Sequence, residues 1–193
     1  MAFQSFKSIV FFFLFQVQVQ GAIGANDSIG VHLEPSHDTF IRRDKGDVLY
    51  GDASKITVTK KGSNQRIGLM KFDTTEYGIN ADKTDATLRL TVADTHQKPV
   101  EVRVYRMVND FHEDHLTWDT FDGDVHSDQT VTFTVKKSHT GQPGEIDVSS
   151  LLRTGEDMVL AFIVDEGHVK FHSKDNDYDL TPKLVLTPRK SEL

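Results

Sequence analysis

Polar and apolar residues alternate with period two along most of the chain, and no segment shows convincing helical periodicity. Ala86 to Val92 places apolar residues at every second position, and Val100 to Val104 and Val131 to Val135 do the same. This alternation predicts strands with one buried face and one solvated face. More continuous apolar runs, Ile67 to Phe72 and Met158 to Val164, predict strands that are covered on both faces or line a groove.

Turn sequences rich in Gly, Asn and Asp separate these runs, as at Lys61-Gly62-Ser63-Asn64. Short strands at this spacing predict an all-β fold, a two-sheet antiparallel β-sandwich, with a jelly roll as the favoured version. The only helical candidate is a single turn around Val148 to Arg153. The chain has no internal repeat and no linker long enough to separate one domain from another, so we expect a single domain.

The first 25 residues have the layout of a cleaved signal peptide. Lys7 precedes an apolar run from Ile9 to Phe15, which is too short to span a membrane, and small residues suit a cut after Gly24 or Ala25. We therefore expect residues 26–193 to form a secreted, extracellular domain with no membrane anchor after cleavage.

Two further signals lie near the ends of the chain. Asn26 begins an Asn-Asp-Ser acceptor for N-linked sugar. The last four residues, Lys190-Ser191-Glu192-Leu193, resemble a retrieval signal of the endoplasmic reticulum, although Ser191 replaces the usual acidic residue. Retention in that compartment is the alternative to secretion.

Charge is distributed unevenly. Between Arg42 and Lys71 eight basic residues accompany three acidic ones, a net charge of +5, whereas the full chain carries −7. A basic face on an acidic body would attract an anionic ligand, and a solvated mixed-charge surface is the alternative. The leader and the acidic total disfavour nucleic acid as that ligand. Because the chain has no cysteine, its stability must come from packing, with or without a bound metal.

Catalytic and metal motifs are scarce. The string His112-Glu113-Asp114-His115 has the wrong spacing for a zinc-protease helix. Asp175, Asp177 and Asp179 alternate along a short segment and are weak candidates for a structural calcium, although the EF-hand pattern fails because Leu180 stands where its glycine is required. A solvated acidic loop is the default interpretation. No cofactor and no catalytic residue is assigned.

Several short strings follow one another in the order of a known family. They are Asp38-Thr39-Phe40-Ile41-Arg42, Tyr50-Gly51, Ile56 to Lys60, Arg66 to Asp73 (RIGLMKFD), Ala86 to Leu90 (ATLRL), Phe111 to Asp119 (FHEDHLTWD) and Glu145 to Leu152 (EIDVSSLL). Together they resemble the DNRLRE-type carbohydrate-binding domain, grouped as carbohydrate-binding module family 96, over nearly all of residues 26–193. Phe111 departs from the Trp usual in that family, at a position where we expect packing rather than ligand contact.

The resemblance implies a β-sandwich that binds acidic, alginate-like polysaccharide through basic residues in its N-terminal third. Carried over to this chain, those residues are Arg42, Lys60, Arg66 and Lys71. Tyr50 is the only aromatic residue inside the basic segment and is added to the predicted site. An arginine can hold a uronate carboxylate through two hydrogen bonds, and a lysine supplies a point charge.

We therefore expect a non-catalytic, monomeric protein that recognises a uronate-type polysaccharide through a basic groove. Two alternatives remain open at this stage. A small extracellular polysaccharide lyase could use the same groove with a His or Tyr as base. A structural or adhesive cell-wall protein would instead have another protein as its partner.

Overall fold

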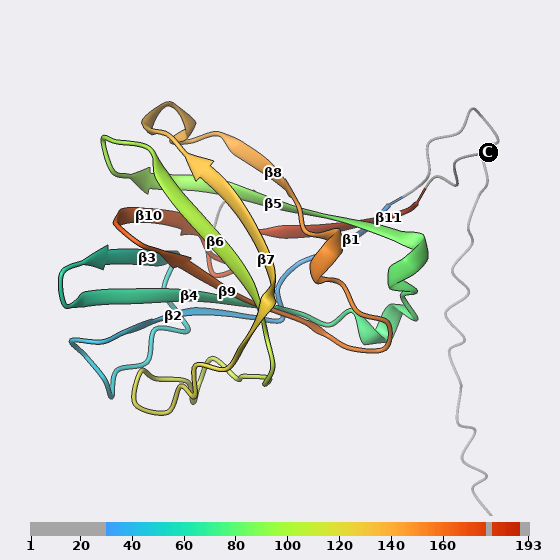
Figure 1. Ribbon diagram of the computed structural model, residues 1–193, viewed down its shortest axis with the longest axis horizontal. Coiled ribbons are helices and arrows are strands. Elements are labelled where there is room, and N and C mark those ends of the chain that lie inside the picture. Colours follow the sequence, from blue (N-terminus) through green and yellow to red (C-terminus); the bar gives the residue numbers. More distant parts are fainter. Residues whose placement is uncertain (1–29, 177–178, 190–193) are drawn as a thin grey trace, which may run out of the picture.

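A computed structural model describes residues 30–176 and 179–189 of the chain. Over these residues the chain forms eleven strands and four single-turn 3₁₀ helices (Figure 1). The strands are β1 Val31–Leu33, β2 His37–Arg42, β3 Lys55–Lys61, β4 Asn64–Phe72, β5 Thr84–Thr95, β6 Val100–Met107, β7 Val125–Val135, β8 Pro143–Asp147, β9 Met158–Val164, β10 Gly167–His172 and β11 Lys183–Pro188. The 3₁₀ helices are η1 Thr75–Tyr77, η2 Ala81–Lys83, η3 Lys137–His139 and η4 Ser149–Leu151. None of the helices among these residues is long and apolar enough to cross a membrane.

The strands pair antiparallel and join into one sheet that folds over into two layers (Figure 1). One layer has the order β2–β4–β9–β6–β7, and the other contains β3, β10, β5, β8, β11 and β1. Phe171 on β10 faces Phe162 on β9 and Phe133 on β7, with ring centroids 6.1 Å and 6.3 Å apart. The predicted all-β antiparallel sandwich is confirmed, and η4 occupies the predicted helical turn.

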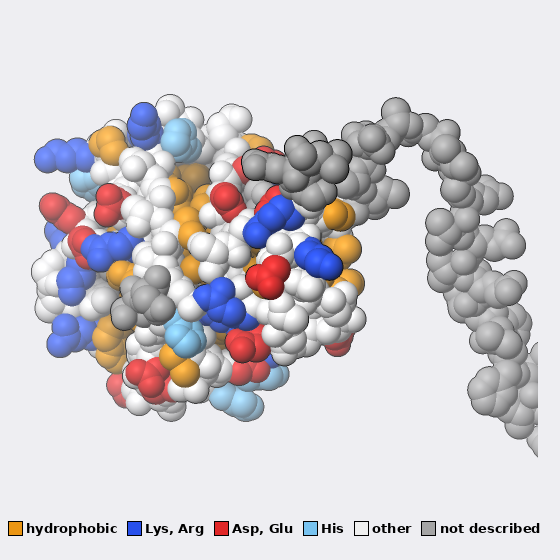
Figure 2. Space-filling view, turned by 45° about the vertical axis from the view of Figure 1, so that its right-hand side comes forward, with side chains coloured by type: hydrophobic (Ala, Val, Ile, Leu, Met, Phe, Trp, Pro, Cys, Tyr) orange, Lys and Arg blue, Asp and Glu red, His pale blue; other side chains and the backbone are white. Residues whose placement is uncertain are grey.

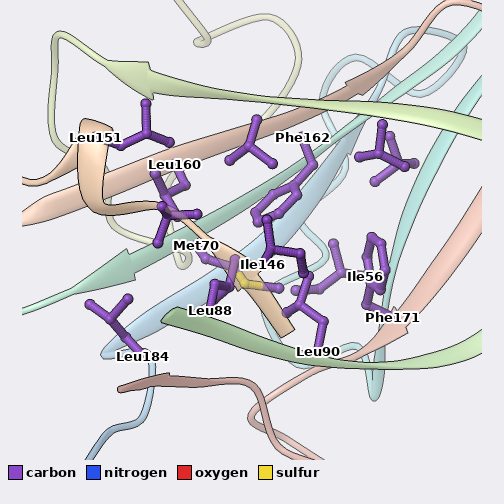
Figure 3. Close-up of a cluster of buried hydrophobic side chains, with 14 of the residues drawn as sticks. Ile56, Met70, Leu88, Leu90, Ile146, Leu151, Leu160, Phe162, Phe171 and Leu184 are labelled. Atoms are coloured by element: carbon purple, nitrogen blue, oxygen red, sulfur yellow. The ribbon is translucent and has the colours of Figure 1, made fainter. Parts of the chain in front are cut away.

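The core lies between the two layers and is built by the alternating positions of the strands (Figure 3). On β5, Ala86, Leu88, Leu90 and Val92 are all buried in it, whereas Arg89 on the opposite face is exposed. Burying a Leu or Phe side chain contributes about 1.5–3 kcal/mol relative to leaving it in water. This burial selects the register of each strand, because a slip by one residue would exchange the two faces.

A second, smaller apolar cluster covers the outer face of the layer that contains β4 and β9. Ile67 and Leu69 of β4 contribute to it, and the segment between β6 and β7 packs over them through Phe111 and Trp118. The expected burial of β4 and β9 on both faces is therefore confirmed. The single tryptophan, Trp118, is half-buried against this cluster.

Gly68 lies where β3 folds back over β4. A Cβ atom at Gly68 would lie 2.7 Å from Ile56 Cγ2 and 3.0 Å from Val58 Cγ2. Close-packed side chains do not approach so closely, so glycine lets the two strands pack directly against each other. Three residue pairs at the turn join β3 to β4, whereas the pairing of β3 with β10 of the facing layer runs from Lys55 to Lys60.

Candidate functional site

Two arginines of the predicted site lie directly opposite each other on neighbouring strands. Arg42 ends β2, and its partner in the antiparallel register is Arg66 of β4. The Arg42 guanidinium donates two hydrogen bonds to Asp44, from Nε to Oδ1 at 3.1 Å and from Nη2 to Oδ2 at 2.6 Å. This bidentate contact raises the pKa of Arg42 above its ordinary value.

Arg66 is the unpaired member of the two. Among the described residues it forms no ion pair, and its buried Nε has no hydrogen-bond partner. Burial and then the neighbouring charge of Arg42 lower the pKa of Arg66, and the attraction of Asp44 only partly opposes them. Asp44 therefore balances the charge of Arg42 but only part of the charge of Arg66, so the pair of arginines can bind one more anion.

Tyr50 joins this arginine pair from the segment between β2 and β3. Its ring stacks on Phe40 of β2, with centroids 4.4 Å apart and planes inclined by 24°. The Arg42 Cζ atom lies 5.8 Å from the Tyr50 ring centroid, within the range of a cation–π contact. The structure thus brings together three of the five predicted site residues, and it fixes the tyrosine ring beside the positive charges.

Lys60 belongs to a neighbouring basic pocket at the turn end of β3. Its Nζ donates to Gln65 Oε1 at 3.2 Å, and among the described residues it forms no ion pair. The pocket has a volume of about 390 Å³ and is lined by Thr59, Lys60, Lys61, His96, Lys98, Pro99, Val100, Glu166, Gly167 and His168. Three lysines face one glutamate in this set, so the pocket favours an anionic occupant.

The register of four strands joins this pocket to the arginine pair. Arg66 lies opposite Arg42 on one side and Thr59 on the other, and Thr59 in turn lies opposite His168 of β10. With neighbouring strands about 4.8 Å apart, this row covers about 14 Å of sheet. Figure 2 shows several Lys and Arg side chains along the left-hand margin of the domain, interspersed with acidic groups.

Lys71, the remaining predicted residue, lies elsewhere. Successive side chains of a strand point to opposite faces, so the five-residue step from Arg66 takes Lys71 to the other face of β4. There its Nζ lies 2.6 Å from Asp110 Oδ2, 3.7 Å from Asp157 Oδ2 and 3.8 Å from Asp73 Oδ1. Burial alone would lower the pKa of Lys71, but these carboxylates raise it.

The structure describes two of the three predicted calcium residues, Asp175 and Asp179, and they have different surroundings. Asp175 lies close to two other carboxylates, those of Asp38 and Glu113. Asp179 is almost fully exposed and pairs with Lys183 at 3.3 Å. Asp177 lies outside the described residues, as do Asn26, the expected cleavage site and the C-terminal tetrapeptide.

Sequence reasoning did not find Lys98 and His168, which line the basic pocket, or Asp38 and Glu113, which join Asp175. These residues come from separate segments of the chain, and only strand pairing brings them together. A string such as His112-Glu113-Asp114-His115 carries no signal for such a contact, because its partners lie about 60 to 75 residues away along the chain.

Comparisons with known proteins agree with this architecture. A family model described as carbohydrate-binding module family 96 matches residues 30–188. The match begins one residue before β1 and ends with the last residue of β11, so it spans the sandwich from its first strand to its last. No curated protein matched the chain in a search of such proteins. The chain belongs to carbohydrate-binding module family 96.

Proposed function

We propose that this carbohydrate-binding module is a secreted, non-catalytic protein that binds an acidic, uronate-type polysaccharide. The binding surface comprises the arginine pair Arg42 and Arg66, the ring of Tyr50 and the basic pocket that contains Lys60. The observation that carries the proposal is the half-buried guanidinium of Arg66, which has no ion pair among the described residues.

A uronate supplies the missing partner. Its planar carboxylate accepts two parallel hydrogen bonds from a guanidinium, and such charge-assisted bonds contribute more than neutral ones. A polymer repeats this carboxylate along an extended chain, so one sugar can pair with Arg66 while a neighbouring sugar reaches the basic pocket. The pocket volume of about 390 Å³ lies within the range of small-molecule sites.

Binding to a panel of polysaccharides tests the charge chemistry. Affinity gel electrophoresis with alginate, pectate and a neutral glucan, each at low and high salt, should show retardation by the acidic polymers that weakens as salt increases. Salt-independent binding to the neutral glucan would contradict the proposal.

Arg66→Ala tests the residue that carries the proposal. Loss of hydrogen bonds to a charged group costs about 1.5–3 kcal/mol, so affinity for the acidic polymer should fall about tenfold to about a hundredfold. Arg89→Ala is the matched control, because Arg89 is an exposed arginine on β5 that pairs with Glu145. Equal affinities of the two variants would assign the anion contact to another residue.

A polysaccharide lyase remains the second candidate, because His96 and His168 lie in the basic pocket with ring centroids 5.8 Å apart. An imidazole beside lysines that neutralise a uronate is the arrangement that proton abstraction requires. Incubation with alginate or pectate followed by ultraviolet absorbance detects unsaturated products. Their release by the wild type, and its loss in His168→Ala, would replace the non-catalytic proposal.

Secretion and the monomeric state belong to the same proposal and rest on the sequence of the leader and on the single predicted domain. Expression in a eukaryotic host should yield protein in the medium with its N-terminus at residue 25 or 26. Sedimentation should give the mass of one chain. Accumulation inside the cell that is relieved by removing residues 190–193 would support retention in the endoplasmic reticulum.

A further inference from the structure

Three carboxylates from distant parts of the chain converge at one corner of the sandwich. Asp38 lies near the start of β2, Glu113 in the segment between β6 and β7, and Asp175 just after β10. One ligand oxygen from each lies within 4.8 Å of the others. Among the described residues, this is the one group of three or more acidic or histidine side chains that meets this spacing.

Asp38 is the member that the protein leaves incompletely satisfied. Its side chain is fully buried, with a relative exposure of 0%. Its Oδ2 accepts a hydrogen bond from the backbone N–H of Lys174 at 2.7 Å, but its Oδ1 has no hydrogen-bond partner. Burial, assisted by the charges of Asp175 and Glu113, raises the pKa of Asp38 to about 7. A buried carboxylate oxygen without a partner requires either a proton or a cation.

The ammonium group of Lys174 only partly neutralises the cluster. Its Nζ lies 2.9 Å from Glu113 Oε1 and 2.9 Å from Asp175 Oδ1. The hydrogen bond from Lys174 to the Asp38 side chain comes from the backbone N–H and not from this ammonium group. His37 Nδ1 lies 3.8 Å from Glu113 Oε1, so this imidazole is a second basic group beside the cluster. One lysine charge therefore faces three carboxylates, and the unpartnered oxygen remains.

We propose that Asp38, Glu113 and Asp175 bind one calcium ion. Oxygens that share a Ca²⁺ at about 2.4 Å lie at most about 4.8 Å apart, which matches the spacing of this cluster. Water and backbone carbonyls can complete the six to eight oxygen ligands that calcium usually takes. Glu113 also lines an open pocket of about 410 Å³, together with residues 49–53 and Asp114, so this ligand of the proposed ion faces space that can hold water. Mg²⁺ is the poorer fit, because it needs shorter bonds and a near-ideal octahedron.

The ion would join distant segments that no disulfide connects, since the chain has no cysteine. Glu113 also accepts a hydrogen bond at Oε2 from the backbone N–H of Asp38 at 2.9 Å. A Cβ atom at Gly51 would lie 3.1 Å from Glu113 Cγ, so the segment that carries Tyr50 packs directly on this glutamate. Calcium bound here would therefore order the segment that carries Tyr50, as well as the segments that carry Glu113 and Asp175.

Calcium titration of the full chain after treatment with EDTA tests the site. Isothermal titration calorimetry with CaCl₂ should give one equivalent per chain. At a hundredfold excess of calcium over its Kd, the Tm should rise by about 5–10 °C, and MgCl₂ should give a smaller shift. Absence of calcium heat and of a Tm shift in the wild type would overturn the proposal, whatever the variants do.

Two substitutions localise the ion. Asp175→Asn changes a partly exposed side chain and should abolish the calcium-dependent Tm shift, whereas the control Asp179→Asn, at an exposed aspartate outside the cluster, should retain it. Asp38→Asn mimics the protonated acid, so the variant should remain folded without calcium and lose the response. A full calcium response in Asp175→Asn and Asp38→Asn would place the ion elsewhere.

A third substitution tests whether calcium or only Lys174 neutralises the three carboxylates. Lys174→Met removes the cation that competes for the same oxygens, so the calcium Kd should fall about tenfold or more. Without calcium, this variant should be less stable than the wild type, and calcium should restore the difference. If calcium neither binds this variant more tightly nor restores its stability, Lys174 is the only cation of the cluster and the proposal is wrong.

Discussion

Lys71→Met should weaken the fold and leave polysaccharide binding unchanged. The Lys71 side chain is only 13% exposed, whereas its three carboxylate partners are between 26% and 61% exposed. Removing one partner of a fully buried pair costs about 3–5 kcal/mol, and exposed pairs contribute about 0–1 kcal/mol. The mixed exposure of this cluster places the expected loss at about 2 kcal/mol, because methionine preserves the packing of the apolar stem.

Thermal unfolding measures this loss directly. For a domain of this size, about 2 kcal/mol corresponds to a fall in Tm of about 4–8 °C. Lys83→Met is the matched control, since Lys83 is an exposed lysine of η2. Affinity for alginate should stay within about twofold of the wild type in both variants. An unchanged Tm together with a tenfold loss of affinity in Lys71→Met would refute the assignment and make Lys71 a ligand contact.

The pH dependence provides an internal check on this reasoning. Burial alone would raise the pKa of Asp157, but hydrogen bonds from Thr75 and the charge of Lys71 lower it below its ordinary value of 3.8. A carboxylate with a lowered pKa stabilises the fold above 3.8, and this contribution disappears as the pH falls below that value. The difference in stability between the wild type and Lys71→Met should therefore be full at neutral pH and shrink in acid. A constant difference down to strongly acidic pH would exclude the ion pairs as its cause.

Two further predictions concern the sandwich itself. Gly68→Ala should cost about 1–3 kcal/mol in urea unfolding, because the new methyl group would overlap Ile56, whereas Gly144→Ala, whose nearest neighbour would be 3.8 Å away, should be nearly neutral. Asp147→Asn should flatten the loss of stability in acid, because hydrogen bonds from Ser149 lower the pKa of Asp147, so that its contribution is present above pH 3.8 and lost below it. An acid denaturation curve identical to that of the wild type would exclude this role.

The strands could be predicted from the sequence because their pattern is local. Alternate residues of β5 point to one face, so apolar residues from Ala86 to Val92 were sufficient to predict a buried face. The continuous apolar run in β9 places apolar residues on both faces of the strand, so it predicted that both faces are buried. The second apolar cluster buries the outer face. What this pattern could not identify was the covering segment, because Phe111 and Trp118 follow no strand periodicity.

The candidate site was only partly predictable, and strand geometry gives the reason. Arg42 and Arg66 are 24 positions apart in the chain, yet the β2–β4 register places them opposite each other. Lys71 is only five positions from Arg66, and this odd spacing puts the two side chains on opposite faces of β4, which the prediction of one shared site did not take into account. Counting charge within a segment therefore identified the basic region but could not distinguish an unpaired cation from one enclosed by carboxylates.

The cations of this acidic protein differ in how far carboxylates compensate their charge, as the enclosed lysines Lys71 and Lys174 and the unpaired Arg66 show. Lys71 and Lys174 each contact carboxylates from the turns and loops that flank the strands, so much of their charge is compensated within the fold. Arg66 has no such partner among the described residues, and Arg42 has only Asp44. Within the basic stretch from Arg42 to Lys71, the charge at the arginine pair is therefore less compensated than the charge at Lys71. For this reason the proposed site for acidic sugar follows from the pairing of each cation rather than from the net charge of a segment.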